Sequence, residues 1–317
     1  MNEVHGGDAA ALIQTARAGR RADLARLLTM IERGGDDART VGRLVHPLAG
    51  NAYTVGITGA PGAGKSTLTS AMSAVVRSHG DRIGILAVDP SSPFSGGAIL
   101  GDRIRMGDHV LDDGVFIRSM ATRGHLGGLA LATPSAIRVL DAVGFPWVIV
   151  ETVGVGQVEI EIVGSADTCV VVVNPGWGDA VQANKAGLME IADVFVINKS
   201  DRRGAAATQT DLEQMLSMRV GDGWVPPVIP TVATEGTGAV EVWDAVLAHR
   251  AWLADSGEGD RQRAQRVRAE VEAIVSGTLA ARAAAASSEA GFDAVVDDVL
   301  ARRCDPWSAA DAVLAKM

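Results

Sequence analysis

Residues 59–66, with the sequence GAPGAGKS, have the types and spacing of a phosphate-binding loop. Its glycines let the backbone turn tightly, so successive N–H groups point at a phosphate chain. Lys65 would neutralise the terminal phosphates, and Ser66 would offer a hydroxyl ligand to Mg²⁺. Because this loop lies between a predicted strand and a predicted helix, we predict a Walker A site for a nucleoside triphosphate. The residues predicted to contact the phosphates are Gly59, Gly62, Ala63, Gly64, Lys65, Ser66 and Thr67.

A second motif, Asn198-Lys199-Ser200-Asp201, follows an apolar run about 130 residues later and indicates which base is bound. The Asp201 carboxylate can accept hydrogen bonds from N1–H and the 2-amino group of guanine, a pair of donors that adenine lacks. A site built this way rejects the wrong base, because unpaired polar groups are costly. The backbone N–H of Ala233, in a Gly-rich loop further on, is a supporting candidate. We therefore predict GTP and GDP as ligands, bound by Asn198, Lys199, Asp201 and Ala233.

Acidic residues at predicted strand ends, or in the loops that follow them, are the candidates for the metal site. Carboxyl ends of parallel strands face the ligand crevice, and oxygen ligands suit Mg²⁺. In the run Glu151-Thr152-Val153-Gly154, the amide of Gly154 would sense the γ-phosphate and release the next loop after hydrolysis. Gln157 is the nearest amide side chain for orienting water. The predicted metal ligands are Ser66, Asp89, Asp102 and Glu151, and the predicted catalytic residues are Lys65, Asp102, Glu151 and Gln157.

The elements that must position these residues are short β-rich runs alternating with helical stretches. Several runs are apolar throughout, as in residues 169–173, which is typical of strands covered on both faces. The pattern predicts an α/β P-loop NTPase fold, with a mainly parallel sheet flanked by helices. We expect a helical N-terminal extension over residues 1–50, a nucleotide-binding domain over 51–255, and a helical C-terminal extension over 256–317 that is a candidate for dimerisation. The predicted strands are 53–58, 83–89, 115–118, 147–151, 168–174, 194–198 and 228–232.

Composition restricts the classes of partner. The net charge of -9 argues against nucleic acid, because phosphate binding over a broad surface needs clustered basic residues. Two cysteines are too few for a disulfide framework, which is typical of a reducing cytoplasm. The first ten residues lack the features of a signal peptide, and no apolar run is long enough to span a bilayer. We expect a cytoplasmic protein that binds neither membrane nor nucleic acid.

Strings beyond the generic motifs resemble the MeaB/ArgK family of GTPases, which assist adenosylcobalamin-dependent acyl-CoA mutases. The resemblance covers nearly the whole chain. It implies a homodimeric GTPase that complexes with methylmalonyl-CoA mutase or a relative, gates cofactor loading, protects the mutase and hydrolyses GTP faster in its presence. It also implies that Asp89, Asp102 and Glu151 lie around the metal. The strings are residues 88–93, 101–106, 116–119, 122–129, 151–157 and 190–193.

Three other functions stay open at this point. One is an ATPase or kinase linked to amino-acid transport, against which the guanine motif argues. Another is a GTPase that delivers metal to nickel enzymes, although the six histidines have no ligand-like spacing. The last is a nucleotide-dependent scaffold without partner-stimulated turnover.

Overall fold

The computed structural model describes residues 6–89, 112–121, 126–152, 166–176, 190–218, 223–287 and 290–315. The chain divides into two compact units, Met1–Arg263 and Ala264–Met317. The first unit contains both predicted ligand motifs. The division into segments 1–50, 51–255 and 256–317 stays a prediction.

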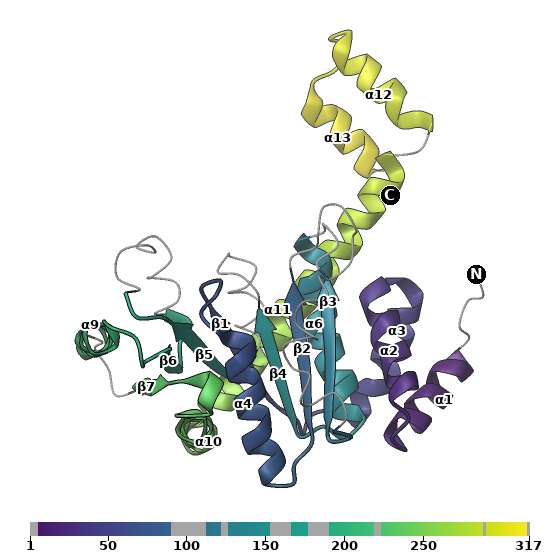
Figure 1. Ribbon diagram of the computed structural model, residues 1–317. Helices are drawn as coiled ribbons and strands as arrows, with labels where there is room; N and C mark the ends of the chain where they lie inside the picture. The colour runs from purple at the N-terminus through teal and green to yellow at the C-terminus, as the bar shows by residue number, and fades with distance from the viewer. Residues whose placement is uncertain are drawn as a thin grey trace. The chain divides into compact units, whose positions relative to one another are not determined.

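The centre of the first unit is a seven-stranded sheet with the order β3-β2-β4-β1-β5-β6-β7 (Figure 1). Each neighbouring pair runs parallel, which confirms the α/β fold. All seven predicted strands are present, with ends within three residues of those expected. β1 lies between β4 and β5, so the loop after β1 opens between two strands. The strands are β1 (Tyr53–Gly59), β2 (Ile83–Asp89), β3 (Val115–Ala121), β4 (Trp147–Thr152), β5 (Thr168–Val173), β6 (Val194–Asn198) and β7 (Val228–Thr231).

Helices cover both faces of this sheet, and alternate strand residues supply the two cores. On one face α4 (Lys65–Ser78) and α10 (Ala239–Ser256) pack on Val170 and Val172. On the other face α9 (Ala205–Ser217) packs on Val171, and α6 (Leu126–Ala142) packs on β2 and β4. Burial on both faces is the reason that these strands are apolar without interruption.

Three helices precede the sheet: α1 (Gly6–Arg17), α2 (Arg21–Arg33) and α3 (Gly35–Val45), followed by the short η1 (His46–Leu48). The sequence pattern predicts a helical extension over residues 1–50 without setting the number of its helices. Their apolar faces share one core with α6, and they lie beside the β3 edge (Figure 1). The Asp141 carboxylate accepts hydrogen bonds from the backbone N–H groups of residues 50–52, which fixes the chain between these helices and β1.

The second unit consists of the later part of α11 (Glu258–Ser287), then α12 (Ala290–Leu300) and α13 (Pro306–Leu314). Asp305 caps α13 by accepting from the N–H groups of Trp307 and Ser308, with Pro306 at the first helical position. Across the described ranges of both units, no helix is both long and apolar enough to cross a membrane.

Candidate nucleotide-binding site

The loop between β1 and α4 follows a path that requires glycine at two points. Gly59 has φ 143°, and a Cβ atom there would lie 2.0 Å from the carbonyl oxygen of Val172. Gly64 has φ 93°, and a Cβ atom there would lie 2.2 Å from Asn198 Nδ2. Both positions favour a residue without a side chain. The motif glycines therefore let this loop approach β5 and the end of β6 closely.

Lys65 is the first residue of α4 and is buried within the loop that precedes it. Its Nζ donates to the carbonyl oxygens of Gly59 at 2.6 Å and Ala60 at 3.1 Å. The positive end of the α4 dipole and this ammonium group lie together, and both favour a bound anion. The residues present therefore fit a phosphate chain.

Oxygen-bearing side chains meet where β1 and β4 end. Glu151 pairs in register with Ile57 of β1, and its Oε1 accepts a 2.5 Å hydrogen bond from Ser66 Oγ. One residue later, Thr152 Oγ1 donates to Thr58 Oγ1 at 3.0 Å. A hydroxyl and a carboxylate side by side are the donor set that Mg²⁺ prefers, so Ser66 and Glu151 fit its binding.

The remaining candidates for metal binding and hydrolysis are placed only in part. Asp89 is the last residue of β2 and pairs in register with Ala121, but its side chain lies outside the described residues. Asp102, Gly154 and Gln157 also lie outside them. Their predicted roles stay predictions.

Asn198, the last residue of β6, joins the base motif to the phosphate loop. Its Nδ2 donates to the carbonyl oxygen of Ala63 at 2.8 Å. Its Oδ1 accepts from Thr231 Oγ1 and from the N–H of Ala233, each at 3.1 Å. This buried amide is thus bonded to three residues at once, and the bonds hold the phosphate loop against the end of β7 and the loop after it.

Lys199 makes a second bridge between the same motifs. It has a left-handed backbone with φ 60°, which is uncommon outside glycine. Its Nζ donates to the carbonyl oxygen of Gly62 at 2.6 Å. The backbone N–H of Ser200 also donates to the carbonyl oxygen of Thr231 at 3.0 Å. Two motifs far apart in sequence therefore form one connected structure.

Asp201 is exposed in the turn after β6, in the same turn as Lys199. Thr67 lies in the first turn of α4. The N–H of Ala233 bonds to Asn198 in this structure, so its contact with a nucleotide stays a prediction. The sequence motifs gave no role to Thr58, Thr152 or Thr231. Each carries a hydroxyl at the end of a buried strand, and that position was the available signal.

Comparison with known proteins identifies the family of the chain. The sequence model of the family described as "Methylmalonyl Co-A mutase-associated GTPase MeaB" matches residues 24–288. The chain belongs to this family. It is therefore a P-loop GTPase, and the predicted guanine nucleotide and fold class are confirmed at that level.

Relatives of this MeaB family chain extend over most of its length. A Pyrococcus abyssi protein assigned as a GTPase is 51% identical over 310 residues, covering 96% of each chain. "GTPase ArgK" of Escherichia coli is 37% identical over 262 residues, covering 80% of this chain and 79% of the relative. The crystal structure of a "LAO/AO transport system kinase" covers 99% of both chains, with 27% identity and a TM-score of 0.71.

A mouse protein, "Methylmalonic aciduria type A homolog, mitochondrial", is 38% identical over 213 residues, which are 65% of this chain and 51% of the mouse protein. The match therefore covers about half of the mouse protein. The shared part supports the family assignment, and nothing more is transferred from it.

Proposed function

We propose that this chain is a GTP-dependent chaperone of an adenosylcobalamin-dependent acyl-CoA mutase, methylmalonyl-CoA mutase or a relative. In this proposal the nucleotide state gates cofactor loading and protects the mutase, and the mutase raises a low intrinsic rate of GTP hydrolysis. The observation that carries the proposal is the pair of bridges from Asn198 and Lys199 to the phosphate loop, together with the mutase association in the family's description.

The chain's own residues account for nucleotide recognition. Lys65 and the N-terminus of α4 would hold the phosphates, and Asp201 would pair with the guanine edge. Ser66 and Glu151 would hold Mg²⁺, which when bound supplies positive charge to the phosphates. Because Asn198 and Lys199 connect the two halves of the site, a change at the phosphates is transmitted to the base loop.

We also propose a homodimer formed through the second unit. Part of α11 exposes an apolar stripe with helical spacing, each residue having about half of its surface accessible. Such a stripe is typical of a face that packs against another helix. The stripe consists of Val267, Val271, Ile274, Val275 and Leu279.

Turnover of GTP by the pure protein, with and without purified methylmalonyl-CoA mutase, tests the proposal. We expect a stimulated rate with the cognate mutase and none with an unrelated acyl-CoA enzyme. The absence of stimulation by every adenosylcobalamin-dependent mutase tested would contradict the chaperone role and favour the scaffold. ATP turnover that matched GTP turnover would instead favour the kinase alternative.

A further inference from the structure

The outer side of the N-terminal helices carries a groove far along the chain from the nucleotide motifs. The groove has a volume of about 740 Å³ and runs between α1 and α2. Its lining residues recur with helical spacing on both helices, so each helix contributes one continuous face. The lining residues are Asp8, Ala11, Leu12, Thr15, Arg20, Asp23, Ala25, Arg26, Thr29, Met30 and Arg33.

Three arginines line this groove together with two aspartates, of which Asp23 is buried and Asp8 of α1 is exposed. Arg20, Arg26 and Arg33 lie along its α2 side and are exposed, whereas the whole chain has a net charge of -9. Arg26 and Arg33 are seven residues apart, which is about 10 Å along one side of a helix. The groove is therefore a basic strip on an acidic protein.

A buried carboxylate organises part of the strip. Asp23 is 4% exposed, and its Oδ2 accepts from Thr15 Oγ1 at 2.7 Å across the two helices. Arg20 and Arg26 lie 3.5 and 3.4 Å from its two oxygens, with 69% and 71% of their side chains exposed. The two guanidinium groups face solvent although the carboxylate is buried, so a ligand carboxylate can reach them. Arg33 forms no ion pair within the described part of the chain, so its charge is available to a ligand.

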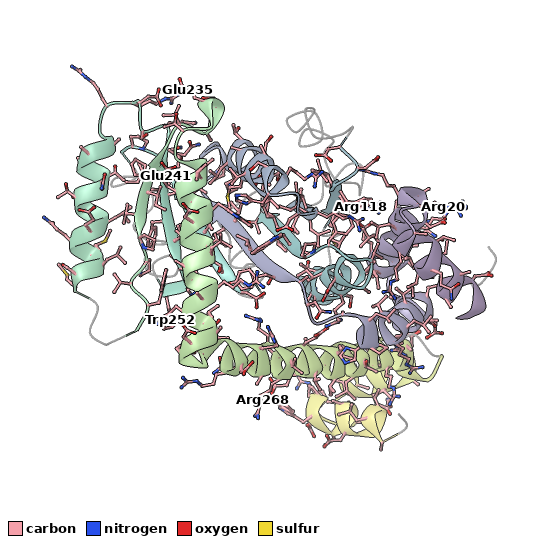
Figure 2. The ribbon with its side chains drawn as sticks, turned by 90° about the horizontal axis from the view of Figure 1, so that it is seen from below. Arg20, Arg118, Glu235, Glu241, Trp252 and Arg268 are labelled. Carbon is pink, nitrogen blue, oxygen red and sulfur yellow. The ribbon has the colours of Figure 1, made fainter. Side chains whose placement is uncertain are left out.

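Two sets of polar contacts fix α2 to the edge strand β3. Arg21 donates to the carbonyl oxygens of Asp112 and Val115 near the start of that strand. Arg118 of β3 is labelled in Figure 2. It donates to both oxygens of Glu32, at 2.9 and 2.7 Å, and to Thr29 Oγ1. Charge-assisted, bidentate pairs of this kind hold a defined geometry. These contacts fix the position of the groove relative to β3. The last residue of β3, Ala121, pairs in register with Asp89 of β2.

We propose that this groove docks an acidic amphipathic helix of the mutase partner. Its apolar floor of Ala11, Leu12, Ala25 and Met30 would cover the apolar side of that helix, and the arginines would pair with carboxylates spaced about seven residues apart. The inference rests on the proposed function, because it names the surface through which the mutase is held.

Charge reversal at one position, with a matched control, tests the surface. Arg33→Glu changes the groove, whereas Arg17→Glu makes the same charge change at an exposed position of α1 that does not line it. The measurement is the Kd of each variant for purified methylmalonyl-CoA mutase, with a non-hydrolysable GTP analogue and Mg²⁺. We expect Arg33→Glu to weaken binding about fivefold or more at about 0.1 M salt and less at high salt, and Arg17→Glu to stay near wild type.

The outcomes separate the two proposals. If wild-type protein binds the mutase and both variants bind equally well, the groove is wrong and the chaperone role stands. If wild-type protein binds no adenosylcobalamin-dependent mutase, the proposed function fails and the docking surface with it. Unchanged affinity of both variants for GTP shows that the nucleotide site is intact.

A photo-crosslink identifies what occupies the groove. Burial raises the pKa of Cys169 well above its usual value and keeps it an unreactive thiol, so Cys304→Ser leaves an engineered cysteine as the labelling site. Ala11 lines the groove and is exposed, so Ala11→Cys in that background keeps all three arginines; labelled with a benzophenone, it should capture a mutase peptide with Asp or Glu at seven-residue spacing. Capture of a peptide without such carboxylates would overturn the proposal.

Discussion

Strands β1, β5 and β6 lie between two polar clusters of different character. One cluster is at the carboxyl ends of the strands, called here the carboxyl edge, and the other is at their amino ends, the amino edge. At the carboxyl edge, Lys65, Asn198 and Lys199 donate to backbone carbonyls of the phosphate loop. At the amino edge, side chains bond mainly to one another. Figure 2 shows the two edges on the α10 side, with Glu235 near the first and Trp252 near the second.

The amino-edge cluster is a buried chain of hydrogen-bonding groups. Tyr53 Oη and Thr168 Oγ1 are 2.6 Å apart, and Thr168 Oγ1 is 2.9 Å from Nδ1 of His249. The other ring nitrogen, Nε2, lies 3.4 Å from Asp193 Oδ1, and the ring stacks on Trp252. Burial lowers the pKa of His249 to about 4, so the imidazole is neutral near pH 7.

The polar groups at the two ends of the strands differ in what they can bind. At the carboxyl edge, glycines bring backbone close to side chains, and the groups there can exchange partners with a ligand. At the amino edge, aromatic rings enclose the polar groups, so these groups hold α10 on the sheet. We therefore propose that the first cluster recognises the nucleotide and that the second stabilises the fold.

The strongest way to break this comparison is at Lys65. Lys65→Met should lower GTP affinity by at least about 100-fold, or about 3 kcal/mol, and abolish turnover, because it removes the ammonium group at the phosphates. Calorimetry with a non-hydrolysable GTP analogue measures the loss. Retained affinity would show that the loop is not the phosphate site.

Asn198→Ala tests whether one side chain holds the carboxyl edge together. It removes bonds to Ala63, Thr231 and Ala233, so the free energy of unfolding should fall by about 3 to 4 kcal/mol. Denaturant unfolding measures this change. Thr231→Val, which removes only one of these bonds, should cost about 1 kcal/mol; equal losses from the two variants would contradict the shared role of Asn198.

The pH dependence of unfolding tests the amino edge. The pKa of His249 is about 4 when folded and about 6.5 when unfolded, so the unfolded chain binds more protons between these values. Stability should therefore fall by up to about 3 kcal/mol as the pH falls from 6.5 to 4. His249→Phe should remove this part of the slope and leave GTP affinity at pH 7 unchanged. A variant with the wild-type slope would show that another group titrates.

The smallest expected effect sharpens the base assignment. Asp201→Asn should weaken GTP binding at least about tenfold, or about 1.4 kcal/mol, with little effect on weak ATP binding. Titration of both nucleotides into wild type and variant measures it. Equal affinity of the wild type for GTP and ATP would remove the guanine assignment at the carboxyl edge.

Local pattern was enough to predict much of the fold and the two motifs. The continuous apolar runs of β5 and β6 predicted central strands directly, since burial on both faces leaves no polar alternation to misread. The number of N-terminal helices was not readable from the sequence, because the apolar stripe of α3 is short: Val41 and Val45 are its buried residues. The phosphate and guanine motifs were readable because their residue types follow directly from ligand chemistry.

By itself, the sequence determined which residues can meet a phosphate chain and a guanine base, because those residues lie in short contiguous strings. Only the tertiary structure decided that Asn198 bonds to Ala63 and Lys199 to Gly62, that Thr168 joins Tyr53 to His249, and that Arg118 holds Glu32. The two residues of each pair are more than 80 positions apart in the sequence, and no local pattern links them. Strand order and helix packing bring them together, and no spacing along the chain encodes that order.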